Sequence, residues 1–217
     1  MKHYVVATPI GNLEDITLRA LRILKQVDFI VCEDTRRTQI LLNNYQIKKP
    51  LVSFHQHSKL QKIEFIIDEL KNGKDVALVT DAGTPGLADP GGVLIEEALK
   101  YNIEVEPIPG PSAVTSLISV SGWKTDKFLF LGYLPKKKGR QTLFSQFKDF
   151  DYPIVIFESP QRIIKTLQEL LSGWGDREVI IGRELTKKFG QILRGKISEI
   201  ITKIRPQGEF VIIINVK

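Results

Sequence analysis

Short apolar runs rich in β-branched residues alternate along the first half of the chain with longer segments in which apolar residues recur at helical spacing. The runs are 4–7, 29–32, 51–54, 76–80 and 105–108, and the longer segments are 16–24, 38–45, 59–72 and 92–101. The first pattern predicts strands and the second predicts helices. Because parallel strands need long crossover connections, the alternation predicts a mostly parallel sheet with helices on both faces.

The pattern changes after a further helix expected at 112–121. A polar break at 122–126 precedes strands expected at 128–131, 154–157, 179–183 and 210–216, with helices expected at 141–149 and 163–171. The short spacing of the later strands favours some antiparallel pairing, and therefore a mixed sheet. We predict two α/β domains, residues 1–121 and 122–217.

Glycine and proline punctuate three loops that follow predicted strands of the first domain, at 8–13, 81–86 and 109–113. Ligands of open α/β sheets bind outside the carboxyl ends of the strands, where these loops would lie. Neither G-x-G-x-x-G nor G-x-x-x-x-G-K-[ST] occurs, which disfavours a nicotinamide dehydrogenase or a nucleoside triphosphatase. A single loop of this kind is more often a simple turn, but three at one sheet edge indicate a ligand held largely by backbone groups.

Charge divides the chain unequally. Residues 1–120 carry 13 Lys and Arg against 15 Asp and Glu, whereas residues 121–217 carry 18 against 10, so the halves have net charges of −2 and +8. The basic half suits an anionic polymer such as RNA, and it is equally compatible with a solvated basic surface.

Cysteine content and hydropathy narrow the picture further. The single cysteine, Cys32, excludes an internal disulfide and a cysteine-cluster metal site, and its apolar neighbours indicate burial. No apolar run is long enough to cross a membrane and no secretory leader pattern is present, so we expect a cytoplasmic protein.

Seven ordered blocks cover essentially the whole chain and closely resemble the bacterial small-subunit (16S) ribosomal RNA cytidine 2′-O-methyltransferase family of the tetrapyrrole methylase superfamily. The blocks are 4–21, 33–36, 79–85, 108–113, 158–160, 183–187 and 208–211. The resemblance implies S-adenosylmethionine bound in a cleft between two α/β domains, a homodimer, and methyl transfer to a cytidine ribose. It implies ribosomal RNA or the small ribosomal subunit as the partner.

The resemblance also implies which residues contact the cofactor, mostly through their backbone. These are Pro9, Ile10, Asp81, Ala82, Gly83, Thr84, Ser112, Ala113, Phe157, Glu158 and Ser159.

Methyl transfer to a ribose hydroxyl depends on alignment of the reacting atoms and gains from a nearby base or cation, and it requires no metal. The candidate catalytic residues are Glu33, Asp34, Arg36 and Glu158. Asp34 could instead cap the following helix. Glu158 could instead form an intradomain salt bridge with Arg162.

Candidate RNA contacts come from histidines and basic residues, namely His55, His57, Lys136, Lys137, Lys138, Arg140 and Arg162. Two histidines at period-two spacing could also bind a metal, but without a third ligand we expect none. The sequence departs from the resembled pattern at Gln161, where histidine is common, which weakens any essential proton acceptor there. Many relatives continue beyond the last block into a small C-terminal module, whereas this sequence ends at Lys217.

Two other functions remain open at this point: a small-molecule methyltransferase nearer the tetrapyrrole branch, and a non-catalytic RNA-binding relative. The basic second half favours RNA over a small molecule. The intact glycine- and proline-rich loops favour a working cofactor site over a binding module.

Overall fold

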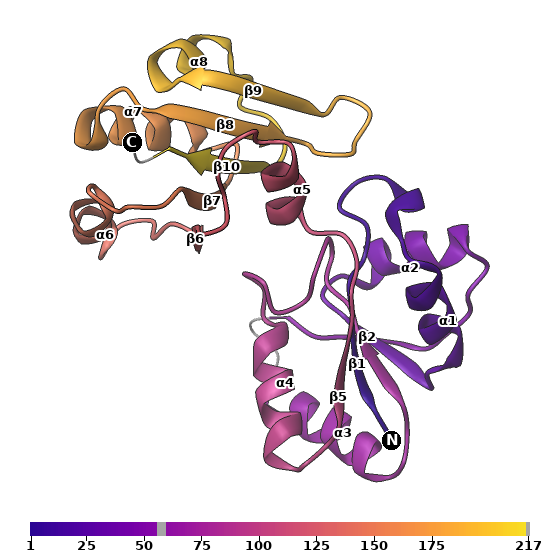
Figure 1. Cartoon of the computed structure of the whole chain (residues 1–217). Helices are drawn as coiled ribbons and strands as arrows, with labels where there is room; N and C mark the ends of the chain where they lie inside the picture. The colour runs from indigo at the N-terminus through magenta and orange to yellow at the C-terminus, as the bar shows by residue number, and fades with distance from the viewer. Residues whose placement is uncertain (56–59, 216–217) are drawn as a thin grey trace. The chain divides into compact units, whose positions relative to one another are not determined.

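The computed structural model describes residues 1–55 and 60–215 and divides them into two compact units, Met1–Ser112 and Ala113–Lys217 (Figure 1). Each unit contains one five-stranded sheet. In the described part of the chain, no helix is long and apolar enough to cross a membrane.

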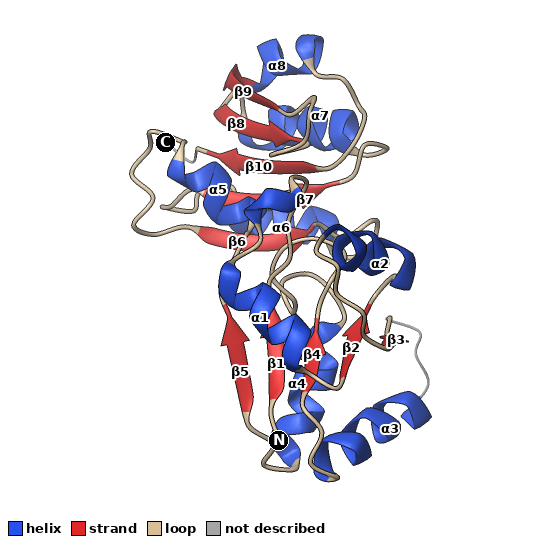
Figure 2. Cartoon of the chain, turned by 90° about the vertical axis from the view of Figure 1, so that its right-hand side faces the viewer, coloured by secondary structure: helices blue, strands red, loops and turns tan. Residues whose placement is uncertain are grey.

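The sheet of the first unit is entirely parallel and has the order β3-β2-β4-β1-β5 (Figure 2). Its strands are β1 (His3–Val6), β2 (Phe29–Cys32), β3 (Leu51–Ser53), β4 (Val76–Leu78) and β5 (Val105–Ile108). The helices of this unit are α1 (Leu18–Gln26), α2 (Thr35–Asn44), α3 (Leu60–Lys71) and α4 (Gly91–Lys100), with a 3-10 turn, η1, at Leu13–Asp15.

Helices cover both faces of this sheet, and alternate residues of its strands therefore belong to two different cores. Ile30 and Cys32 of β2 pack in a core that includes residues of α1 and α2. Phe29 and Val31 of the same strand pack with residues of α3 and α4. Strands buried on both faces are apolar throughout, and this explains their continuous apolar runs. The predicted parallel sheet is confirmed, and Cys32 is buried as expected.

The sheet of the second unit is mixed, as predicted, with the order β6-β7-β10-β8-β9. Its strands are β6 (Leu129–Tyr133), β7 (Ile154–Glu158), β8 (Glu178–Arg183), β9 (Gln191–Lys196) and β10 (Phe210–Ile214). Strands β6 and β7 are parallel, and the other neighbours are antiparallel. The helices are α5 (Ala113–Ser119), α6 (Arg140–Phe147), α7 (Ile163–Trp174) and α8 (Ile197–Lys203).

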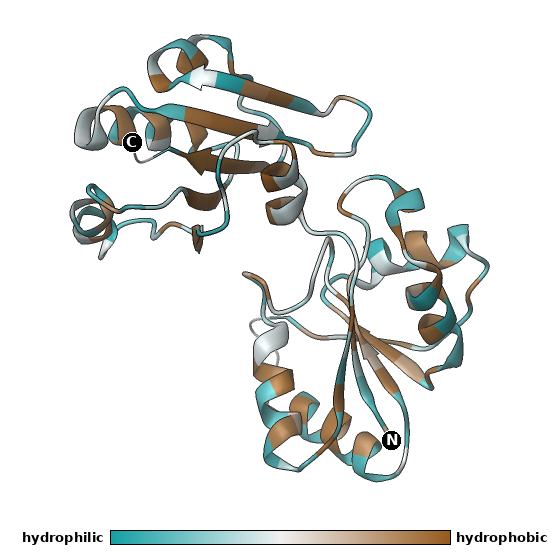
Figure 3. Ribbon diagram, viewed as in Figure 1, coloured by the Kyte–Doolittle hydropathy of each residue, from teal (hydrophilic) through white to brown (hydrophobic). Residues whose placement is uncertain are grey.

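Apolar side chains pack on both faces of the second sheet. The ribbon in Figure 3, coloured by hydropathy, shows that the central strands of this sheet are largely hydrophobic. One core joins Ile156 and Ile212 to helices α6, α7 and α8. The other joins Val155 and Val211 to α5, which contributes Leu117. The packing of α5 explains why the first unit ends at Ser112, nine residues before the expected boundary at residue 121.

Two elements of the second unit were not expected from the sequence, strand β9 and helix α8. Strand β9 is an edge strand whose residues are mostly exposed, so it lacks the apolar run that reveals the central strands. Helix α8 has only seven residues, too few to show a helical apolar period.

Candidate functional site

The glycine- and proline-rich loops of the first unit are joined by direct backbone contacts. The Thr8 N–H donates to the Gly83 carbonyl at 2.9 Å, and the Gly83 N–H donates back to the Thr8 carbonyl at 3.0 Å. The Thr84 hydroxyl donates to the Pro111 carbonyl at 3.3 Å. The loops after β1, β4 and β5 therefore form one connected structure at the carboxyl ends of neighbouring strands.

Two glycines allow this close approach. A Cβ atom at Gly110 would lie 3.0 Å from the Cβ of Ala7. Gly83 has a φ of +83°, and a Cβ there would lie 3.3 Å from the Cγ2 of Ile10. Residues with side chains rarely adopt this backbone conformation, so the second loop depends on glycine at position 83.

The loop after β2 joins the same edge through Asp81. The Asp81 carboxylate accepts the backbone N–H of Asp34 at 3.0 Å, and its other oxygen lies 3.5 Å from the Nε of Arg37. Asp34 itself begins helix α2 by accepting the Arg36 N–H at 2.9 Å. The proposed capping role of Asp34 is therefore present in the structure.

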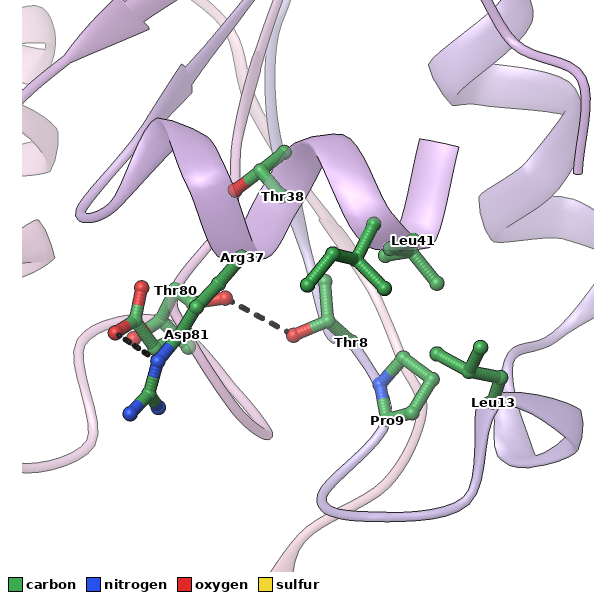
Figure 4. Close-up of a pocket in the computed structure, with 9 residues that line it drawn as sticks. Thr8, Pro9, Leu13, Arg37, Thr38, Leu41, Thr80 and Asp81 are labelled. Carbon is green, nitrogen blue, oxygen red and sulfur yellow. Dashed lines mark hydrogen bonds and ion pairs between the residues drawn. The ribbon is translucent and has the colours of Figure 1, made fainter. Parts of the chain in front are cut away.

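A pocket of about 120 Å³ lies between the first loop, helix α2 and the end of β4 (Figure 4). Its lining combines apolar and polar residues, namely Thr8, Pro9, Leu13, Arg37, Thr38, Ile40, Leu41, Thr80 and Asp81. Ligand pockets typically measure about 300–1,000 Å³, so this one can hold part of a ligand but not a whole nucleoside-sized cofactor. The Arg37–Asp81 pair places a cation and an anion at the same point of its wall.

The two neighbouring carboxyl groups after β2 differ strongly in basicity. Burial, reinforced by the negative charges of Asp81 and Asp89, raises the pKa of Glu33. Hydrogen bonds from the Arg36 side chain and backbone lower the pKa of Asp34 to about 2. Glu33 is therefore the stronger proton acceptor of the two.

In the second unit, Glu158 at the end of β7 is completely buried within a hydrogen-bonded network. Its carboxylate lies 2.6 Å from Nη2 of Arg162 and accepts the Thr166 hydroxyl at 2.6 Å and the Ser159 N–H at 2.7 Å. The alternative that Glu158 forms an intradomain salt bridge is thus the arrangement observed.

Arg140 belongs to the same network. Its guanidinium donates to the Thr166 hydroxyl at 2.8 Å, to Glu169 Oε2 at 2.7 Å and to the Pro135 carbonyl at 3.1 Å, and the residue is only 5% exposed. Arg162 also donates to the Leu134 carbonyl at 2.9 Å. In this structure both arginines fix the loop that follows β6.

The other candidate RNA contacts lie apart from this network. Lys136, Lys137 and Lys138 are exposed between β6 and α6, and His55 is exposed just after β3. His57 lies outside the described residues. No cluster of His, Cys, Asp or Glu that could hold a metal ion occurs among the residues described.

The structure thus brings Pro9, Ile10 and the 81–84 segment together with Asp34, while Ser112 ends the first unit and Ala113 opens α5 in the second. Phe157 and Ser159 flank the buried Glu158. Sequence reasoning did not single out Arg37 or Thr38, which line the pocket. The only sequence signal that could have identified Arg37 and Thr38 is that they directly follow the candidate segment 33–36.

Comparisons with known proteins agree with this architecture. The chain matches the sequence profile of the Tetrapyrrole (Corrin/Porphyrin) Methylases over residues 2–201. It is similar in fold to a solved diphthine synthase, with a TM-score of 0.79, 13% identity and coverage of 99% of this chain and 89% of that one. A solved cobalt precorrin-4 methyltransferase has a TM-score of 0.72 at 18% identity, covering 98% of this chain and 94% of the other.

Curated relatives are much more similar in sequence. A protein of Thermotoga maritima named Ribosomal RNA small subunit methyltransferase I is 50% identical over 219 residues, covering 100% of this chain and 99% of the relative. A protein of the same name from Halalkalibacterium halodurans is 44% identical, covering 97% of this chain and 74% of the relative. The resemblance found in the sequence blocks is therefore confirmed over the whole chain.

Proposed function

We propose, from the premise that this chain belongs to the tetrapyrrole (corrin/porphyrin) methylases, that it transfers a methyl group to the ribose 2′-oxygen of a cytidine in 16S ribosomal RNA. The observation that carries the substrate is the 50% identity, over the full length of both chains, to a relative named as a small-subunit ribosomal RNA methyltransferase. The fold alone would not select RNA, because solved relatives under 20% identity have names with quite different substrates.

S-adenosylmethionine is the proposed methyl donor, and it supplies a sulfonium methyl group that a nucleophile can displace. The residues present fit such a ligand because the glycines at 83 and 110 let three loops pack closely at the carboxyl ends of parallel strands, where ligands of open α/β sheets bind. Pro9, Ile10 and the 81–84 segment would hold it in the first unit. Ser112, Ala113 and the 157–159 segment would add the remaining contacts.

Glu33 is the proposed proton acceptor for the ribose hydroxyl. Its raised pKa makes it a better base than Asp34, whose carboxylate is committed to Arg36. Glu158 is engaged by Arg162 and Thr166 and acts as a positioning residue. Arg36 pairs with Asp34 through Nε and Nη2, and its side chain, 88% exposed, can meet the RNA backbone through its remaining N–H groups.

The basic second unit is the proposed RNA-binding surface. The unit Ala113–Lys217 has a net charge of +8, the same as residues 121–217, because residues 113–120 are uncharged. The exposed Lys136, Lys137 and Lys138 would neutralise phosphates and release counterions on binding. We further propose a homodimer working in the cytoplasm on ribosomal RNA or the small subunit.

Mapping ribosomal RNA methylation by mass spectrometry tests the function directly. Small subunits lacking the modification are incubated with S-adenosylmethionine and either the wild-type protein or a Glu33→Gln variant. A single new 2′-O-methylcytidine with the wild-type protein is expected, and its formation should be much slower with the variant. Absence of methylated RNA, together with methylation of a tetrapyrrole substrate, would replace this function by the small-molecule alternative.

A further inference from the structure

Arg183, the last residue of β8, carries a buried positive charge, and two of its guanidinium nitrogens have no hydrogen-bond partner among the described residues. The residue is 7% exposed, and the two nitrogens are Nε and Nη1. Burying a charge is costly unless it is paired and hydrogen-bonded. The burial of the Arg183 guanidinium without hydrogen bonds at these two atoms therefore costs folding free energy.

The same unit shows how a buried arginine is normally accommodated. Arg140 is buried to a similar degree, but its guanidinium donates to a carboxylate, a hydroxyl and a carbonyl group. The contrast is therefore specific to the site of Arg183. A buried polar group without a hydrogen-bond partner in a native structure calls for a specific explanation, and a role in the site's chemistry is one.

The strand register places Arg183 in a row of paired residues that runs across the sheet at one end of its strands. Phe210 of β10 pairs with Glu158 on one side and with Arg183 on the other. Gln191 of β9, which is exposed, pairs with Arg183 from the next strand. Side chains of directly paired residues project from the same face, and neighbouring strands are about 4.8 Å apart, so Glu158 and Arg183 are about 10 Å apart at their Cα atoms.

The nearby carboxylates already have other partners. Glu158 is engaged by Arg162 and Thr166. Glu184, which follows Arg183, accepts the Lys187 ammonium group at 2.9 Å. The charge of Arg183 attracts the neighbouring carboxylate of Glu184, but neither Glu158 nor Glu184 accepts a hydrogen bond from the Nε or Nη1 atoms of Arg183.

We propose that Arg183 is an oxyanion-binding residue, and that its ligand is a carboxylate or phosphate group reaching it at the Gln191 edge of the sheet. A guanidinium group forms short, charge-assisted hydrogen bonds with both kinds of oxyanion. The exposed amide of Gln191 adds a neutral donor beside the charge. The two sources in a methyltransferase of RNA are the carboxylate of the cofactor's amino-acid moiety and a phosphate of the substrate; this choice rests on the proposed function.

Inorganic phosphate tests the site without relying on the proposed function. Thermal unfolding is measured in sodium phosphate and in sodium chloride at equal pH and ionic strength for the wild type and for Arg183→Met. The wild-type midpoint should rise in phosphate by about 2 °C or more relative to chloride, because a ligand that binds only the folded state stabilises it. Arg183→Met should lose this increment, and in chloride it should unfold at the wild-type temperature or above, since a buried charge with unsatisfied hydrogen-bond donors has been removed.

Two further variants sharpen this comparison. Arg205→Met removes one exposed arginine charge from the same unit and should keep the wild-type increment. Arg183→Lys keeps the positive charge but changes the hydrogen-bond geometry, so it should keep part of the phosphate-dependent increase in unfolding temperature. This variant gives a second readout if Arg183→Met does not fold. Absence of a phosphate increment in the wild type, or its full retention in the folded Arg183 variants, would overturn the proposal.

Two binding experiments then distinguish the sources. If the ligand is the cofactor carboxylate, wild-type protein should bind S-adenosylmethionine about tenfold or more tightly than its decarboxylated analogue, and Arg183→Met should not discriminate between them. If the ligand is an RNA phosphate, the slope of log K against log salt concentration should fall by about 0.7–0.9 in Arg183→Met. Wild-type behaviour of the variant in both experiments would exclude both sources and overturn the proposal.

Discussion

The carboxylate of Asp81 accepts the backbone N–H of Asp34 at 3.0 Å, although the two residues are 47 positions apart in the sequence. This hydrogen bond ties the loop after β4 to the loop after β2, and Arg37 lies close to the second oxygen of the same carboxylate. One side chain therefore couples the proposed cofactor loop to the start of α2, where the proposed substrate-facing residues lie.

Removing this side chain should loosen both loops together. Asp81→Ala should lower the free energy of unfolding by about 1–2 kcal/mol, because the Asp34 N–H loses a charged acceptor, and should weaken S-adenosylmethionine binding tenfold or more. Asp81→Asn retains an acceptor oxygen and should have a smaller effect on stability. Chemical denaturation and calorimetry measure the two quantities. Cofactor affinity unchanged in Asp81→Ala would remove this loop from the site.

A methyl group at position 83 should disturb the proposed cofactor loop 81–86 much more than a methyl group at Gly92 would. Gly83→Ala meets both a φ of +83° and the nearby Cγ2 of Ile10, so it should cost about 1 kcal/mol or more and weaken cofactor binding. Gly92→Ala is the matched control, since Gly92 lies in α4 and its added Cβ would meet nothing within 4 Å. That control should be neutral or stabilising by up to about 1 kcal/mol. Equal cofactor affinities in the two variants would count against a tight cradle at Gly83.

The fold could be predicted largely from apolar periodicity, because the buried strands have continuous apolar runs and intervening helices such as α1 show a helical period. Periodicity could not show that α5 packs on the second sheet, since a sequence pattern identifies an apolar face without identifying its partner. It also could not reveal the exposed edge strand β9.

The loops of the candidate site were predictable to a similar extent. Glycine and proline revealed the loops through turn chemistry, and the resemblance of whole blocks to a known family implied their ligand. The hydrogen bond from Asp34 to Asp81 and the surroundings of the buried Arg183 guanidinium depend on contacts between distant segments. Such contacts leave no local pattern in a single sequence.

Substitutions at Glu33 and Asp34 should distinguish a role in proton transfer from a role in helix capping. Glu33→Gln should lower kcat about 10²-fold or more while leaving cofactor affinity unchanged, because a positioned general base contributes roughly 10²–10⁴-fold. It should also abolish the acidic limb of the kcat–pH profile. Asp34→Ala removes the helix cap and should mainly reduce stability, by about 1 kcal/mol. If the acidic limb persists in Glu33→Gln, another group accepts the proton.

The lysine run of the second unit should control the salt dependence of RNA binding. Replacing Lys136, Lys137 and Lys138 by Ala should weaken RNA binding and lower the slope of log K against log salt by up to about 2–3, with little change in stability. A triple Ala variant of Lys25, Lys48 and Lys49, in the unit with net charge −2, removes the same charge and should leave the slope nearly unchanged. Equal slopes for the two triple variants would make the run an ordinary solvated loop.

His3 should make the first unit sensitive to acid. Its side chain is fully buried in β1, neither ring nitrogen has a hydrogen-bond partner in the described part of the chain, and burial lowers the pKa of its imidazole to about 4. The unfolded chain binds a proton near pH 6.5, whereas the folded chain resists protonation until about pH 4. Stability is therefore complete above pH 6.5 and should fall as the pH decreases toward 4, by about 3 kcal/mol from this group alone.

Replacing His3 by Leu tests the origin of this acid sensitivity. The apolar side chain cannot take up a proton, so the decline in unfolding free energy between pH 6.5 and 4 should be shallower by about 3 kcal/mol than in the wild type. Urea denaturation at a series of pH values measures the difference, with the offset at pH 8 reporting any change in packing. Parallel curves for the two proteins across this range would show that other groups cause the acid sensitivity. Since His3 starts β1, which pairs with both β4 and β5, its protonation should loosen the strands that carry all three proposed cofactor loops.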